Sequence, residues 1–419
     1  MDSTARRRLD CISHHLFLPY QPTHFLQPGL VSNGQLKVGE AEPVIIGGMV
    51  LDIHATPLIP ASPRTTTPGM INYVLGGVAR NVAECMSKLG TKPFMISVLG
   101  LDMAGNMLLD HWKSAELSTE GILRQDDIKT AVVSNIFDAN GEVAAGVASV
   151  EAIEKYLTPD WIQKFKRNIH SAPVIMVDAN LDLSALEASC QIAALSKTPV
   201  WFEPVSVAKS QRIVSVAKYV TFVSPNEYEL ISMANALSGG SVFSYSSFES
   251  DNIESLLQRL KPAIWVLLKN GIKIVVVTLG SKGVLLCSKG GPSFMRVGHE
   301  GYEQDISRRK LYKTVALDCP KFIYDSTKSE TLLFAIHFPG LPASVVRLTG
   351  AGDCLVGGTL SSICAGLDVM QSLAVGIAAA KAAVEAEANV PHVLNLAAIA
   401  GDARLVYSAA KVVCQESIL

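Results

Sequence analysis

The stretch Thr349-Gly350-Ala351-Gly352-Asp353-Cys354-Leu355-Val356-Gly357-Gly358 sets a glycine-rich turn directly before an apolar, helix-like run. Small residues at a helix start let backbone amides converge on an anion, and the helix dipole adds to the attraction. The carboxylate of Asp353 would then lie beside the bound anion. This suits phosphoryl transfer, in which a carboxylate takes the proton of an attacking hydroxyl while amides stabilise the transferred phosphate. An ordinary turn whose Asp balances the helix dipole is the alternative.

Apolar runs that read as strands alternate with helical patterns before this stretch. The expected strands are Val44 to Ile46, Phe94 to Leu99, Val174 to Val177, Val200 to Phe202, Val220 to Val223 and Ile274 to Thr278. A helix is expected over residues 78–89, where apolar residues recur at helical spacing and Gly90 follows. Such alternation predicts an α/β fold with a mostly parallel sheet covered by helices on both faces.

A second, smaller sheet is expected outside this alternation. Thr130 to Phe137 and Glu142 to Val150 flank Asn140-Gly141, a strong hairpin signal, and Met70 to Leu75 reads as another strand. A small sheet attached to an α/β body commonly closes over a ligand as a lid, although a purely structural flap explains the pattern equally well.

The ends and one long connection lack these patterns. Residues 1–42 are expected to form a flexible tail, and one domain is expected over 43–410, with lid strands at about 51–75 and 128–150. The connection over residues 288–345 is interpreted as an insertion without chemistry.

Composition excludes several classes of protein. The net charge is −2, with 49% hydrophobic and 18% charged residues, which argues against a nucleic-acid-binding surface and against wholesale disorder. No uncharged apolar run is long enough to cross a membrane. The eight cysteines are scattered without metal-ligand spacing, which favours reduced thiols inside a cell.

Three further elements resemble parts of a sugar kinase. Gly76-Gly77-Val78-Ala79-Arg80-Asn81 places glycines and an amide at a helix start, Thr278-Leu279-Gly280-Ser281-Lys282-Gly283 ends a strand in a turn, and Asn226-Glu227-Tyr228-Glu229 opens a helix. With Gly350 to Asp353, they match in order and spacing the ribokinase-like pfkB carbohydrate kinase family, from about Val44 to Asn389.

The resemblance implies a Rossmann-type three-layer α/β/α sandwich with a small β-sheet lid. It also implies transfer of the ATP γ-phosphate to a sugar hydroxymethyl group. Asp353 would be the general base, with an anion hole at Gly350, Ala351 and Gly352. The implied substrate contacts are Asp52, Gly76, Gly77, Asn81, Thr130, Asn180 and Lys209. The implied ATP contacts are Thr278, Gly280, Ser281, Gly283 and Asn226. Asn226 with Glu229 would also organise Mg²⁺, mainly through water.

Within the family, several details resemble the pseudouridine kinases. They are Arg80 directly before Asn81, Asp178-Ala179-Asn180 after a strand, Glu203-Pro204-Val205-Ser206 with Lys209, and Phe137 to Glu142 in the lid hairpin. The implied reaction is phosphorylation of the pseudouridine 5′-hydroxyl. A kinase for another ribosyl or sugar substrate, or a catalytically silent sugar-kinase-like regulator, is the alternative. A dinucleotide-dependent oxidoreductase is disfavoured because no G-x-G-x-x-G turn follows the first strand.

One residue departs from the family pattern. The signature usually begins with Asp three residues before its first Gly, where it helps to shape a monovalent-cation site, and this chain has Arg347 there. A guanidinium repels K⁺ and cannot bind it as a ligand, so we expect weak or absent potassium activation.

Two further expectations concern partners and location. Arg8-Leu9, five residues and His15-Leu16 resemble the N-terminal peroxisomal address R-L-x5-H-L, which predicts an import receptor as partner; an incidental basic tail or a weak mitochondrial presequence is the alternative. The exposed second sheet also predicts a homodimer through the lid.

Overall fold

The computed structural model describes residues 41–60, 64–138, 143–244, 252–290, 306–320 and 332–417. The targeting motif within residues 8–16 and the turn at Asn140-Gly141 lie outside these ranges. In the described part of the chain, no helix has the length and apolarity needed to span a membrane.

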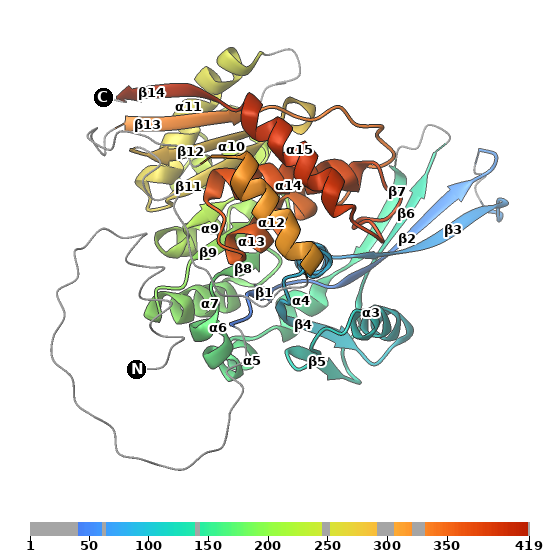
Figure 1. Ribbon diagram of the computed structural model, residues 1–419. Coiled ribbons are helices and arrows are strands. Elements are labelled where there is room, and N and C mark those ends of the chain that lie inside the picture. The colour runs from blue at the N-terminus through green and yellow to red at the C-terminus, as the bar shows by residue number, and fades with distance from the viewer. Residues whose placement is uncertain are drawn as a thin grey trace, which may run out of the picture.

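A ten-stranded sheet forms the body of the molecule, in the order β14-β13-β12-β11-β10-β9-β8-β1-β4-β5 (Figure 1). Neighbouring strands from β5 to β11 pair in parallel, and β12, β13 and β14 extend the sheet with antiparallel pairings. The strands are β1 Val44–Ile46, β4 Phe94–Gly100, β5 Ile122–Gln125, β8 Ile175–Asp178, β9 Val200–Glu203, β10 Phe222–Val223, β11 Ile274–Thr278, β12 Val284–Lys289, β13 Leu332–Phe338 and β14 Lys411–Ser417.

Helices cover both faces of this sheet and enclose two apolar cores. One face carries α2 Val78–Lys88, α3 Met103–Ser114, α12 Ile306–Asp318, α13 Ala351–Cys364, α14 Val369–Val384 and α15 Leu396–Ala409. The other carries α4 Glu151–Tyr156, α5 Pro159–Lys164, α6 Lys166–Ser171, α7 Leu183–Leu195, α8 Val207–Ser210, α9 Ile213–Val216, α10 Glu227–Leu237 and α11 Ile253–Lys269. The three-layer α/β/α arrangement predicted from the sequence is confirmed.

The second sheet is also present and projects from the body (Figure 1). Its four strands lie in the order β3-β2-β6-β7, with β2 parallel to β6 and the outer pairs antiparallel. They are β2 Val50–Pro57, β3 Gly69–Gly76, β6 Ala131–Phe137 and β7 Val143–Ser149. Both β2 and β3 lie between β1 and α2 in the chain, so the lid is continuous with the elements that begin the body.

Two expected boundaries need correction. The domain does not end at residue 410, because β14 runs to Ser417 and pairs with β13. The connection over 288–345 is not merely an insertion: β13 lies between two strands of the main sheet, and α12 buries Tyr312 against the core. The hydroxyl of Tyr312 donates to the carbonyl oxygen of Leu89 at 3.0 Å. Both elements lie within a long connection that is rich in charged residues, and their packing partners are far away in the chain.

Candidate active site

The glycine-rich stretch at residues 349–353 forms the N-terminus of α13. Gly350 caps the helix with φ of 86°, in the left-handed region that favours glycine, and a Cβ there would lie 2.1 Å from the carbonyl oxygen of Asn389. The amide of Ala351 donates to the carbonyl oxygen of Leu348 at 3.3 Å. The amides of Gly352 and Asp353 occupy the first turn, where a helix provides no acceptor. The structure therefore favours these two amides for binding an anion.

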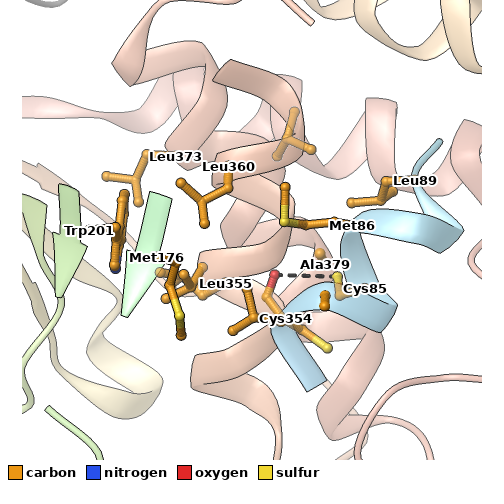
Figure 2. Close-up of a cluster of buried hydrophobic side chains, with 14 of the residues drawn as sticks. Cys85, Met86, Leu89, Met176, Trp201, Cys354, Leu355, Leu360, Leu373 and Ala379 are labelled. Carbon is orange, nitrogen blue, oxygen red and sulfur yellow. Dashed lines mark hydrogen bonds between the residues drawn. The ribbon is translucent and has the colours of Figure 1, made fainter. Parts of the chain in front are cut away.

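Close packing of α2 on α13 brings the two signature elements together. The thiol of Cys85 on α2 donates to the carbonyl oxygen of Cys354 on α13 at 3.6 Å (Figure 2). A Cβ on Gly357 would lie 2.8 Å from the carbonyl oxygen of Val82, so the helices can approach this closely only with glycine at that position. As a result, Asn81 Nδ2 donates to Asp353 Oδ2 at 2.6 Å, although 272 residues separate them in the chain.

Asp353 has the electrostatic environment of a general base. Burial raises its pKa to about 7, and the nearby charges of Asp178 and Asp52 act in the same direction, whereas the hydrogen bond from Asn81 and the charge of Arg80 oppose them. Its side chain nevertheless stays partly exposed. A carboxyl group with a pKa near neutrality is well matched to accept a proton from a hydroxyl at physiological pH.

Asp52 approaches this group from lid strand β2. Burial raises the pKa of Asp52 to about 6, against a hydrogen bond from the Asn389 side chain and the positive charges of Arg80 and Arg347. Gly76, at the end of β3, lies directly against the Asp52 carboxylate. Gly77 follows as the partly exposed N-cap of α2. The expected sugar-binding residues Asp52, Gly76, Gly77 and Asn81 are therefore brought together with Asp353.

Asn180 and Lys209 form a pair beside the carboxyl ends of β8 and β9. Lys209 Nζ donates to Asn180 Oδ1 at 2.7 Å, and the Asn180 side chain also hydrogen-bonds to Asp178. Asp178 is fully buried and accepts from the amide of Gly48 at 2.9 Å, and its burial raises its pKa. Lys209 and Asn180 remain partly exposed, so their polar groups can face a ligand held between the lid and the sheet.

The expected nucleotide residues follow the neighbouring strands β10 and β11. Thr278 ends β11 and forms a parallel bridge with Asn226, which joins the two expected elements. Gly280 and Ser281 are exposed in the next turn. Because carboxyl ends of parallel strands meet at one edge of a sheet, these residues lie along the same edge as Asp178 and Glu203.

The structure gives Asn226 and Glu229 a structural role. Asn226 Oδ1 accepts from the Glu229 amide and Glu229 Oε2 accepts from the Asn226 amide, each at 2.9 Å, so the pair forms a capping box that begins α10. Among the described residues, no three His, Cys, Asp or Glu side chains are grouped to bind a metal ion. The second Glu229 oxygen lies outside the capping box and is available to Mg²⁺, which fits the expected contact through water.

Two residues expected to touch ligands are buried for structural reasons. Thr130 is 3% exposed, and its hydroxyl accepts from the Gly100 amide and donates to Asp102 Oδ1. Gly283 packs against the segment after β13, where a Cβ would lie 2.1 Å from the carbonyl oxygen of Phe338. We therefore assign Thr130 and Gly283 to support of the fold, in correction of the expected ligand contacts.

Two residues that position or act on the site residues, Asp178 and Asn389, were not predicted from the sequence. Asp178 was noted only as part of the segment Asp178-Ala179-Asn180, with no role of its own, and Asn389 lies in a loop after α14 without a recognisable motif. Asn389 donates to the carbonyl oxygen of Leu75 at 3.1 Å and to Asp52, which ties the C-terminal segment to the base of the lid.

Comparison with known proteins identifies the family. A model described as "pfkB family carbohydrate kinase" matches residues 41–298, more than half of the chain. This chain belongs to the pfkB carbohydrate kinase family. It is accordingly a kinase that phosphorylates a hydroxyl group, and the family expected from the sequence is confirmed.

Named relatives include two pseudouridine kinases. The one from Arabidopsis thaliana is 56% identical over 384 residues, covering 88% of this chain and 97% of the relative. The one from Escherichia coli is 27% identical over 197 residues, covering 47% of this chain and 62% of the relative. Among solved structures, Arabidopsis thaliana ribokinase complexed with ribose and ATP matches with a TM-score of 0.64 at 17% identity, covering 87% of this kinase and 99% of that chain. The structural likeness supports the ribokinase-like fold.

Proposed function

We propose that this kinase transfers the γ-phosphate of ATP to the 5′-hydroxyl of pseudouridine and so forms pseudouridine 5′-monophosphate. The 56% identity to the Arabidopsis pseudouridine kinase, across 97% of that relative, carries the proposal. The pairing of Asn180 with Lys209 at the sheet edge supports it, because both belong to the segments that resemble this subfamily.

The chemistry follows from the geometry at α13. The pseudouridine 5′-oxygen attacks the γ-phosphorus while the bond from that phosphorus to the bridging oxygen breaks and ADP leaves. Asp353 accepts the proton of the 5′-hydroxyl, and the amides of Gly352 and Asp353 stabilise charge on the transferred phosphoryl group. General-base help of this kind contributes about 10²- to 10⁴-fold, and positioning supplies much of the remainder.

Mg²⁺ neutralises phosphate charge when it is bound with ATP. The structure fits a loosely held ion, since Glu229 has one oxygen outside the capping box and Asn226 Oδ1 is used within it. Glu229 would therefore orient water around the ion.

A substrate panel tests this function. ATP-dependent phosphorylation of pseudouridine, uridine, ribose, fructose and adenosine would be compared by kcat/KM. Pseudouridine differs from uridine in its C-glycosidic bond and free N1–H, so an acceptor facing that N–H should give pseudouridine the highest value. Preference for ribose or another nucleoside would overturn the substrate assignment, and absence of all turnover would favour the regulator.

Two subsidiary proposals concern assembly and location. We propose a homodimer through the lid, supported by Met70, Ile71 and Tyr73 on β3, each more than half exposed. We also propose that the Arg8-Leu9 and His15-Leu16 motif directs the protein to peroxisomes through an import receptor. Loss of peroxisomal import of a fluorescent fusion on Arg8→Ala would support this address; unchanged import, or a cytosolic wild type, would refute it.

A further inference from the structure

A chain of polar contacts runs from the middle of α2 to Asp353. The Arg80 side chain is almost completely buried, at 3% exposure of the residue, and its Nη2 forms an ion pair with Glu84. Its Nη1 donates to Asn81 Oδ1 at 2.5 Å and to the carbonyl oxygen of Leu75 at 2.6 Å. Asn81 then donates through Nδ2 to Asp353 Oδ2 at 2.6 Å.

The contacts permit only one orientation of the Asn81 amide. An amide group has one acceptor end and one donor end. With Oδ1 on the guanidinium and Nδ2 on the carboxylate, both contacts are attractive. Rotating the amide by half a turn would place NH₂ against NH and oxygen against carboxylate, which is repulsive at both ends. Arg80 therefore determines which end of Asn81 faces Asp353.

The guanidinium is itself held by a buried carboxylate. Glu84 is 3% exposed and also accepts from Lys88 at 2.5 Å and lies 3.2 Å from His111 Nε2 on α3. Burying charged groups costs free energy unless each is paired and hydrogen-bonded in good geometry. Lys88 donates in turn to the carbonyl oxygen of Pro391 at 2.7 Å, which anchors the network to the C-terminal segment.

The charges facing Asp353 come from several elements. Burial is the main cause of the raised pKa of Asp353, and the charges of Asp178 on β8 and Asp52 on β2 add to it, whereas Arg80 on α2 supplies positive charge. Burial also raises the pKa of the neighbouring Glu203 on β9 well above its usual value, which favours the uncharged form of that carboxyl group. The guanidinium thus opposes Asp178 and Asp52 and favours the charged form of Asp353, which is the form that can accept a proton.

We propose that Arg80 is a positioning residue for phosphoryl transfer, which orients Asn81 and thereby holds the Asp353 carboxylate in place. The proposal rests on the role of Asp353 in the proposed function. It assigns Asn81 to the catalytic carboxylate as well as to the substrate. Arg80 touches neither ligand and acts only through its neighbours.

The test compares two variants that differ only at Arg80. Glu84→Gln removes the buried counter-charge, and the double variant Arg80→Met/Glu84→Gln leaves no charge of this pair unpaired. Relative to Glu84→Gln, the double variant should lose about 10- to 100-fold in kcat, with KM for ATP nearly unchanged. In the pH profile of kcat/KM for the nucleoside, the acid limb of the double variant should move to higher pH by about half a unit or more, because Asp353 loses a nearby positive charge.

A mild third variant covers the case in which the double variant does not fold. Arg80→Lys keeps the charge but loses the planar fork that joins Glu84, Leu75 and Asn81, so kcat should fall at unchanged KM for ATP. If the double variant folds, an unchanged kcat and an unchanged acid limb overturn the proposal. If only Arg80→Lys folds, an unchanged kcat in that variant overturns it. Asp353→Asn is measured in parallel: if it retains turnover, the proposed role of Asp353 fails, whereas an inactive Asp353→Asn beside an unaffected Arg80 variant refutes only the inference.

Discussion

At the scale of single residues, the catalytic proposal depends on the Asp353 carboxylate. Asp353→Asn keeps the shape of the side chain and can still accept from Asn81, but it cannot take a proton. We expect turnover to fall by about 10²-fold or more while nucleotide binding persists. Turnover is measured by ADP release and binding by calorimetry. Near-normal turnover would remove Asp353 from its role.

The same substitution should alter the dependence of stability on pH. The pKa of Asp353 is raised from 3.8 to about 7 in the folded state, so the folded protein favours the protonated form. The stability contributed by that form is present below about pH 4 and is lost as pH rises toward 7. Asp353→Asn has no such loss, so its melting temperature relative to wild type should rise between pH 4 and 7 and then level off. A difference that stays constant with pH would contradict the raised pKa.

At the scale of elements, α12 shows that residues 288–345 contain part of the core. The Tyr312 hydroxyl bonds to Ser361 at 2.8 Å and to the carbonyl oxygen of Leu89 at 3.0 Å. Tyr312→Phe should lower the free energy of unfolding by about 1–3 kcal/mol, because it leaves buried polar groups with fewer partners. Leu317→Ala on the same helix is the control: Leu317 is 82% exposed, and its replacement should change stability by at most about 0.5 kcal/mol in urea unfolding. Equal effects would argue that α12 is not docked as described.

The loop before α13 is joined to the lid by Arg347. Its Nη1 lies 3.1 Å from His54 Nδ1 on β2, and its positive charge also acts on Asp52. A guanidinium in this position repels a monovalent cation, so turnover at fixed ionic strength should change less than about two-fold when choline replaces K⁺. A strong dependence of turnover on K⁺ would overturn this prediction.

At the scale of the whole molecule, the exposed face of the lid sheet predicts self-association. Ile71 on β3 is 63% exposed and Val147 on β7 is 74% exposed. Ile71→Asp should shift the protein from dimer to monomer in light scattering, because it places a charge in the proposed apolar interface. Val242→Asp, outside the lid at 64% exposure, is the matched control and should leave the mass unchanged. A wild-type monomer would refute the proposed dimer.

The sequence by itself determined the family, six strands of the main sheet and the presence of the second sheet, and it singled out Asp353 as the proposed base. These follow from local signals: apolar runs bounded by turns, and signature residues such as Asn81 and Asp353 whose spacing is short within each motif. The strand β13 and helix α12 were missed, since they lie within a long polar connection and their packing partners lie far away in the chain.

Only the tertiary structure decided how these motifs cooperate. The contact between Asn81 and Asp353 depends on α2 packing against α13. The raised pKa of Asp353 depends first on burial and then on the carboxyl groups contributed by β8 and β2. Likewise, the burial of Thr130 and Gly283 and the contact of Arg347 with His54 arise from segments distant in the chain. Orientation, burial and charge environment are sums over neighbours in space, and a linear pattern does not contain those neighbours.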